Sequence, residues 1–289
     1  MESNKRCQDI GDLPPSKRFH RISAKPVLLA GAASDTGKKK IYEDRWLITD
    51  QLFAVFDGHG GHQVSDYLVN HFQSVFNAER SKGVTMKAIL NSTFKTLDVD
   101  ILDKIDDESG SCAVICAVHD ETFWLANLGD CRAILARKPS SDADSFRAIP
   151  LSKEHMPIYA AESQRIKQAG GYVQDGRVNG RLEVSRAFGD KSLKRSGVIS
   201  TPYVCHFKFK PKTDSFIVMA CDGLWKVMES QAVVDFIVDK LENADITNTT
   251  NSNGDNLARY IARQLLTHVV VDKYAKDNVT IIIVLFNSK

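Results

Sequence analysis

Acidic residues recur beside predicted strands, where they could together bind a cation. They stand at four places, Glu43-Asp44, Asp57-Gly58, Asp222-Gly223 and Asp277-Asn278. A strand end is rigid, and a following glycine lets backbone carbonyl groups approach a ligand closely. Carboxylates gathered at one sheet edge would repel each other unless a cation lay between them, and all-oxygen ligand sets suit Mg²⁺ or Mn²⁺ better than Zn²⁺. Asp-Gly is also a common turn dipeptide, so the spacing leaves a metal site and ordinary turns both open.

Two histidines, His59 and His62, follow Asp57 closely along the chain. An HxxH pair could bind zinc, but two intervening glycines and the lack of a predicted helix leave its geometry unspecified. A loop histidine can equally be structural or solvated. If Asp57 binds a metal, His59 could instead donate a proton, because the pKa of histidine allows both charge states near neutral pH.

The composition is that of a folded globular protein. The chain has 289 residues, of which 43% are apolar and 26% charged, with 38 Lys+Arg against 36 Asp+Glu. That apolar fraction excludes a disordered chain, and 17 Gly with 8 Pro are too few for a collagen-like one. A formal net charge of +2 gives no support to a nucleic-acid-binding domain, which would carry a strong basic excess.

Membrane spans and targeting segments are not expected. The longest apolar run, residues 279–286, is far shorter than the roughly 18 residues that a membrane span requires, and the polar N-terminus has no apolar stretch typical of a signal peptide. The six cysteines form no CxxC pair, which predicts reduced core thiols. We therefore expect a cytoplasmic or nuclear protein, with residues 1–24 as a flexible tail and residues 25–289 as one domain.

The elements that must position these residues come as groups of strands and pairs of helices. Short β-branched runs bounded by Gly, Asp or Asn predict strands at residues 26–31, 45–49, 52–56, 112–118, 122–127, 132–137, 216–220 and 279–286. Apolar residues at three- and four-residue spacing predict helices around residues 64–76, 86–101, 233–241 and 257–269, with a long loop at residues 243–253. This order is not a regular βαβ alternation, so it favours an α+β fold with antiparallel sheets and helices packed outside.

A series of motifs resembles, in this order, those of the metal-dependent protein Ser/Thr phosphatases of the 2C type. They are YED (42–44), FAVFDGHGG (53–61), GSCA (110–113), ANLGDCRA (126–133), AGG (169–171), RVNG (177–180), LEVSRAFGD (182–190), ACDGLW (220–225) and DNVT (277–280). Each motif is weak alone, but the ordered set is specific. Residues 153–155 and 182–185 are most similar to the integrin-linked-kinase-associated branch of that family.

The resemblance implies a central antiparallel β-sandwich flanked by helix pairs, with a binuclear Mg²⁺ or Mn²⁺ centre at one end. Carried over by motif, the metal-binding residues would be Asp57 as the bridging ligand, Gly58 through its carbonyl, Glu43, Asp222 and Asp277, with Asp130 for a weaker third ion. His59 matches the proposed general acid. The implied reaction is attack of a metal-bridging water on phosphoserine or phosphothreonine in phosphoprotein substrates, by a monomer that needs neither nucleic acid nor membrane.

The chain departs from the family pattern at Lys39, where the family usually has a phosphate-gripping arginine. Lysine carries the charge without the planar fork of arginine. Lys39 could take over the phosphate contact as a catalytic-site residue, or the run Lys38 to Lys40 could simply be solvated. Arg186 and Asp190 fit buried salt bridges and are assigned to structure, and residues 191–201 are expected to form a surface flap.

Two other functional classes remain open from the sequence. A catalytically silent relative could bind a partner through the same fold, although such a protein would be expected to lose metal-binding carboxylates. A metal-dependent phosphodiesterase acting on nucleic acid would share the metal chemistry but not the near-neutral charge.

Overall fold

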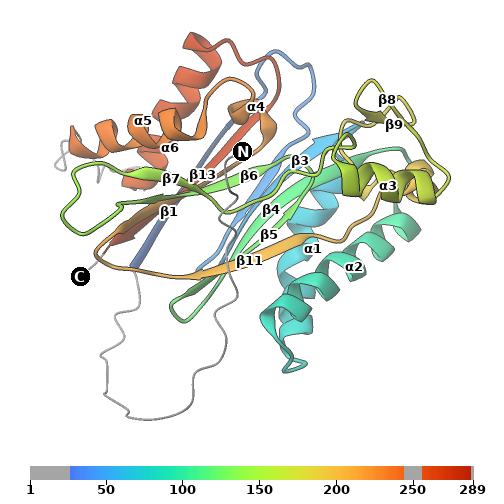
Figure 1. The fold of residues 1–289 in the computed structure, drawn as a ribbon, viewed down its shortest axis with the longest axis horizontal. Helices are drawn as coiled ribbons and strands as arrows, with labels where there is room; N and C mark the ends of the chain where they lie inside the picture. Colours follow the sequence, from blue (N-terminus) through green and yellow to red (C-terminus); the bar gives the residue numbers. More distant parts are fainter. Residues whose placement is uncertain (1–26, 244–255, 288–289) are drawn as a thin grey trace.

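Two antiparallel sheets pack face to face in the computed structural model, which describes residues 27–243 and 256–287 (Figure 1). The first sheet has the strand order β1 (Val27–Asp35), β13 (Val279–Asn287), β12 (Asp214–Ala220), β6 (Arg132–Arg137) and β7 (Arg147–Pro150). The second has the order β11 (Tyr203–Lys208), β5 (Thr122–Leu128), β4 (Gly110–His119), β3 (Leu52–His59) and β2 (Arg45–Ile48), and β10 (Phe188–Gly189) pairs with β4. The predicted α+β class and antiparallel sandwich are confirmed.

Helix pairs cover the outer face of each sheet (Figure 1). Helices α1 (Gln63–Arg80) and α2 (Met86–Lys104) pack on the second sheet, and α5 (Ser230–Glu242) and α6 (Leu257–Thr267) pack on the first. Shorter elements complete the chain: α3 (Ala160–Gln168), the hairpin of β8 (Val173–Gln174) and β9 (Arg177–Val178), η1 (Lys191–Ser196), α4 (Asp222–Trp225) and the π-helical turn η3 (His268–Asp272). None of the helices in the described ranges has the length and apolarity needed to cross a lipid bilayer.

The central strands are buried on both faces, which explains their nearly continuous apolar sequences. In β3, Phe53 and Val55 pack in the core between the sheets, whereas Ala54 and Phe56 pack against α1 and α2. Because successive side chains of a strand point to opposite faces, one short segment contributes to two cores. Asp57 follows Val55 on the inter-sheet face by the same alternation.

All predicted strands and helices are present, and all except the strand at residues 132–137 have a shifted end. The correction that bears most on the acidic cluster concerns the strand predicted over residues 52–56, which continues to His59 because β4 supplies partners from Cys112 back to Gly110. Asp57 therefore lies within a strand, not after it. The helix predicted to reach residue 269 ends at Thr267, where the π-helical turn begins. The predicted tail (1–24) and most of the predicted loop (243–253) lie outside the described residues.

Sequence periodicity did not predict α3 or the strands β7, β8, β9, β10 and β11. The longer two, β7 and β11, are sheet edges and carry exposed polar residues with little alternation, such as Arg147 and Lys208. The others have two residues each, which is too short for a periodic signal.

Glu162 ties α3 to the chain that leads into β10. Its carboxylate, on a residue only 6% exposed, accepts hydrogen bonds from Arg186 Nη2 at 2.5 Å, Arg165 Nη1 at 2.6 Å and Ser185 Oγ at 2.6 Å. Burial acts to raise the pKa of Glu162, but the hydrogen bonds of Arg186, Ser185 and Arg165 outweigh it and lower the pKa to about 2. Arg186 thus has the structural role assigned to it from the sequence.

Replacement Glu162→Gln should destabilise the protein by about 3 kcal/mol at pH 7, since the folded-state pKa is depressed from 4.5 to about 2. A depressed carboxyl pKa stabilises the fold above the unfolded-state value, so the difference from the unmutated protein should shrink as the pH falls from 4.5 toward 2. Urea unfolding at pH 7, 5 and 3.5 measures this. Asp100→Asn, which removes an exposed pair with Lys104, should change stability by less than about 1 kcal/mol; an equal loss in both variants would contradict the assignment.

Candidate active site

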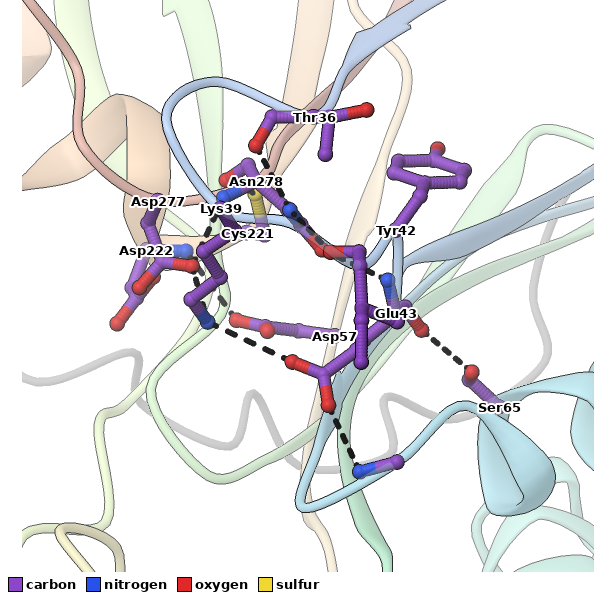
Figure 2. Close-up of polar contacts among 12 residues, drawn as sticks. Thr36, Lys39, Tyr42, Glu43, Asp57, Ser65, Cys221, Asp222, Asp277 and Asn278 are labelled. Atoms are coloured by element: carbon purple, nitrogen blue, oxygen red, sulfur yellow. Dashed lines mark hydrogen bonds and ion pairs between the residues drawn. The ribbon is translucent and has the colours of Figure 1, made fainter.

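Carboxylates from distant parts of the chain meet at one end of the sandwich. Glu43 and Asp44 lie in the β1–β2 loop, Asp57 in β3, Asp130 in the β5–β6 turn, Asp222 at the start of α4 and Asp277 just before β13. One carboxylate oxygen from each of Asp57, Asp130 and Asp222 lies within 4.8 Å of the other two. Figure 2 shows Glu43, Asp57, Asp222 and Asp277 arranged around the side chain of Lys39.

Gly58 permits the close approach of the β1–β2 loop to β3. A Cβ at this position would lie 2.3 Å from the carbonyl oxygen of Glu43, so a larger residue would push the loop away. The Glu43 carboxylate accepts a hydrogen bond from the Gly61 N–H at 2.7 Å, and its carbonyl accepts one from Ser65 Oγ at 2.5 Å. These contacts fix Glu43 beside Asp57.

Asn278 fixes the same loop from the side of β13. Its Oδ1 accepts the Glu43 N–H at 2.7 Å, and its Nδ2 donates to the carbonyl oxygens of Thr36 at 2.9 Å and Ile41 at 3.1 Å (Figure 2). Sequence analysis noted Asn278 only as the neighbour of Asp277. The asparagine is what joins the loop carrying Glu43 to the segment carrying Asp277.

Burial and mutual repulsion oppose ionisation of the clustered carboxylates. The pKa of Asp57 is raised well above its usual range by burial and then by the charges of Asp222, Asp44 and Asp130. Burial and Asp222 likewise raise the pKa of Asp130 to about 6. Asp57 receives only long contacts, from the Asp222 N–H at 3.4 Å and the Cys131 thiol at 3.9 Å.

Asp44 follows Glu43 in the β1–β2 loop, and the sequence motifs assign it no role in metal binding. It is 1% exposed, and neither carboxylate oxygen accepts a hydrogen bond from the described residues. Burial raises its pKa to about 6, although the nearby Thr280 and Cys221 act to lower it. Asp44 thus adds a buried negative charge whose polar neighbours are the Thr280 hydroxyl and the Cys221 thiol, and a bound cation would offset that charge.

Two lysines supply positive charge to the cluster. Lys39 Nζ lies 2.5 Å from Asp277 Oδ1 and 3.7 Å from Glu43 Oε2. Lys226 Nζ pairs with Asp222 and lies 3.8 Å from Asp277 Oδ2. Lys226 stands four residues after Asp222, and this spacing was the only sequence signal that could have found it.

The donor set fits a hard divalent cation. All the candidate ligands are oxygens, which Mg²⁺ and Mn²⁺ prefer. The thiols beside them, Cys112, Cys131 and Cys221, are buried, and burial raises their pKa well above the usual range. They therefore stay protonated and do not offer the thiolate that zinc would favour.

The two histidines point to different carboxylates. His59 Nε2 lies 2.9 Å from Asp190 Oδ2, and His62 Nδ1 lies 2.6 Å from Asp66 Oδ2 in the first turn of α1. This separation does not support a zinc-binding HxxH pair. Asp190, to which the sequence assigned a structural salt bridge, is thus the residue that contacts His59.

A pocket of about 420 Å³ opens above the carboxylates. It is lined by Asp57, Asp222 and His59 together with Lys39 and Lys226. The chain after β9 also lines it, from Arg181 to Val184. Of the predicted flap at residues 191–201, Leu193 lines the pocket.

Comparisons with known proteins agree with this arrangement. The chain matches the family model described as protein phosphatase 2C over residues 30–273. It is 38% identical over 243 residues to the integrin-linked kinase-associated serine/threonine phosphatase 2C of Bos taurus. The aligned part covers 80% of this chain and 65% of that protein. The human protein of the same name is 37% identical, with 80% and 62% covered. Probable protein phosphatase 2C 67 of Oryza sativa subsp. japonica is 34% identical over 287 residues, with 89% and 75% covered.

The chain thus spans 62–65% of the length of these integrin-linked kinase-associated relatives. Solved structures show the same fold. A C. elegans sex determining protein has a TM-score of 0.75 at 24% identity, covering 89% of this chain and 64% of that one. A phosphatase from Toxoplasma gondii has a TM-score of 0.75 at 23% identity, covering 92% and 94%.

Replacement Asp57→Asn should stabilise the metal-free protein, because it removes a carboxyl group whose ionisation is opposed by burial and by the neighbouring acids. We expect a melting temperature higher by about 3 °C in EDTA and loss of most of the increase that Mn²⁺ gives the unmutated protein. Calorimetry with EDTA and with Mn²⁺ measures both effects.

Asp214→Asn is the control, since Asp214 is a buried carboxylate outside the cluster that pairs with Arg137 Nε at 2.5 Å. This variant should melt at a lower temperature in EDTA and keep its response to Mn²⁺. If Asp57→Asn behaved like Asp214→Asn, the carboxylate cluster would not be a metal centre.

Proposed function

The chain belongs to the protein phosphatase 2C family, and from that premise we propose that it is a metal-dependent phosphatase acting on phosphoserine and phosphothreonine in proteins. The observation that carries the proposal is the convergence of Asp57, Asp130 and Asp222, with oxygens within 4.8 Å of one another, at the floor of an open pocket. A phosphate monoester is hydrolysed very slowly without a catalyst, and cations held by these carboxylates would lie where the phosphate enters the pocket.

Asp57 and the carbonyl of Gly58, with Glu43, Asp222 and Asp277, would hold two Mg²⁺ or Mn²⁺ ions, and Asp130 would contribute to a weaker third. When bound, such ions supply Lewis acidity that activates water and offsets the charge of the phosphate oxygens. The protein contributes rigid placement, because β3, the β1–β2 loop and the start of β13 are locked together by Gly58 and Asn278. Positioned ligands of this kind keep the reacting groups aligned without reorganisation.

His59 would donate a proton to the departing serine or threonine oxygen. Burial acts to lower the pKa of His59, but the charge and hydrogen bond of Asp190 outweigh it, so the pKa is raised above its usual value. Asp190 thus increases the share of the protonated imidazolium, and Nδ1 is the ring nitrogen that Asp190 does not contact. General acid catalysis of this kind contributes roughly 10²–10⁴-fold.

Lys39 would bind the substrate phosphate from the rim of the pocket. Its side chain is 38% exposed, and its ammonium already faces Asp277 and Glu43. A lysine offers a mobile point charge in place of two parallel hydrogen bonds, so we expect it to help binding more than orientation.

The alternative of a catalytically silent binding protein is not favoured, because every carboxylate that the family motifs assign to the metals is present, and Asp57, Asp130, Asp222 and Asp277 line one pocket. A nucleic-acid phosphodiesterase is not favoured by the net charge of +2.

The deciding experiment is phosphate release from a phosphothreonine peptide. We expect turnover with Mn²⁺ or Mg²⁺, none after chelation, and loss of at least about 10³-fold in the Asp57→Asn variant. Partner binding without turnover, unaffected by Asp57→Asn, would favour the silent protein. Preference for a phosphodiester over a phosphomonoester would favour the nuclease.

Two substrates with different leaving groups separate the roles of His59 and Lys39. An aryl phosphate leaves without protonation, so His59→Gln should slow hydrolysis of the phosphothreonine peptide about 10²-fold and that of p-nitrophenyl phosphate much less. Lys39→Ala should instead raise the Michaelis constant for both substrates about fivefold. Equal slowing of both substrates in His59→Gln would contradict the general acid, and unchanged Michaelis constants in Lys39→Ala would contradict phosphate binding.

A further inference from the structure

A basic pocket adjoins the catalytic pocket. It has a volume of about 600 Å³ and is lined by Lys39, Lys226, Lys273 and Lys276, with Tyr274 at its edge. Lys39, Lys226 and Asp277 line both pockets, so the two cavities share a wall. Of the residues that line the basic pocket, the reaction proposed above uses only those of the shared wall.

Lys39 and Lys226 in the shared wall are paired with acids of the catalytic site, so the unneutralised positive charge of the basic pocket comes from Lys273 and Lys276. Asp277 is its one acidic lining residue, and it is already paired with Lys39 and close to Lys226. Lys273 and Lys276 are exposed and form no ion pair within residues 27–243 and 256–287. Clustered like charges repel, so a concave basic surface of this kind favours an anion.

Two segments of the chain hold the lysines in place. Gly37 packs so closely on the segment before β13 that a Cβ there would lie 2.1 Å from the Asp277 carbonyl oxygen. On the other side, Ala275 is 1% exposed, and its N–H donates to the Val269 carbonyl at 3.1 Å. The backbone at the basic pocket is therefore anchored on both sides.

Tyr274 adds an aromatic surface to this charge. It is 67% exposed and has a φ of 56°, a left-handed conformation that is unfavourable for a bulky residue. Lys38 Nζ lies 5.4 Å from the centre of its ring. The ring and the lysines together form a surface that could contact both the charged group and the backbone of a peptide.

We propose that the basic pocket binds a second anionic side chain of the substrate peptide, a phosphorylated residue or a glutamate or aspartate close to the phosphoresidue being hydrolysed. This proposal rests on the proposed phosphatase function and specifies its substrate class. Because the pockets share a wall and an extended peptide advances about 3.3 Å per residue, the second anion would lie about two to four residues from the scissile phosphate.

The test compares phosphothreonine peptides that differ only in a second residue. Alanine, glutamate or phosphoserine is placed at each position up to four residues on either side, and kcat/KM for phosphothreonine hydrolysis is measured with Mn²⁺. We expect an increase of about fivefold or more for the anionic residue on one side of the phosphothreonine, larger at low salt. Phosphoserine exceeding glutamate would identify the second anion as a phosphate; equal effects would identify a general acidic preference.

The double variant Lys273→Ala/Lys276→Ala should remove this preference through a higher KM, while kcat/KM for the alanine peptide and for p-nitrophenyl phosphate stays unchanged. Lys87→Ala/Lys212→Ala removes the same charge from exposed lysines elsewhere and should keep the preference. A preference that survives the first double variant, or no preference at any position, overturns the proposal.

Binding measured without turnover keeps this result separate from the phosphatase activity. A fluorescent peptide with the preferred anionic residue should bind the protein in EDTA, and the Lys273→Ala/Lys276→Ala variant should bind it at least about fivefold more weakly. If no substrate is hydrolysed but this difference is seen, the proposed function fails and the basic pocket stands. If p-nitrophenyl phosphate and the alanine peptide are hydrolysed but the binding difference is absent, the basic pocket fails and the proposed function stands.

Discussion

Repulsion between buried carboxylates is the constraint on which the candidate active site depends. Asp57, Asp130 and Asp222 are held with oxygens within 4.8 Å of one another, and burial raises the pKa of each. Such a cluster would separate unless the surrounding backbone were fixed independently. The fold provides this fixation because each acid lies beside a strand whose other residues pack in one of three apolar cores. The stability of the sandwich is therefore what keeps the acids together.

Around this centre, charge is distributed unevenly. The floor of the catalytic pocket is acidic, its shared wall carries Lys39 and Lys226, and beyond that wall the lysines are in excess. The overall charge of +2 hides this separation, since net charge reports only the sum. A short anionic peptide would meet opposite environments within a few residues of its length.

The sequence predicted the fold well where burial imposes a pattern. The strand at residues 132–137 was predicted with its observed bounds, and the acids at strand ends were selected from the residues alone. The sequence could not show that Asp190 contacts His59 or that Asn278 clamps the loop of Glu43, because those partners are 131 and 235 residues apart and the contacts exist only after folding. The edge strands β7 and β11 were not predicted, because their exposed polar residues interrupt the apolar pattern.

The pairing of β3 with β4 has a consequence for how this protein can vary over evolution. Asp57 faces the carboxylates of Asp130 and Asp222 because it stands an even number of residues after Phe53, opposite Cys112. Inserting or deleting one codon between Phe53 and Asp57 would turn the carboxylate toward α1 and α2, since a one-residue slip reverses every side chain of a strand. Length changes can accumulate in surface turns, whereas this stretch must be inherited without gaps.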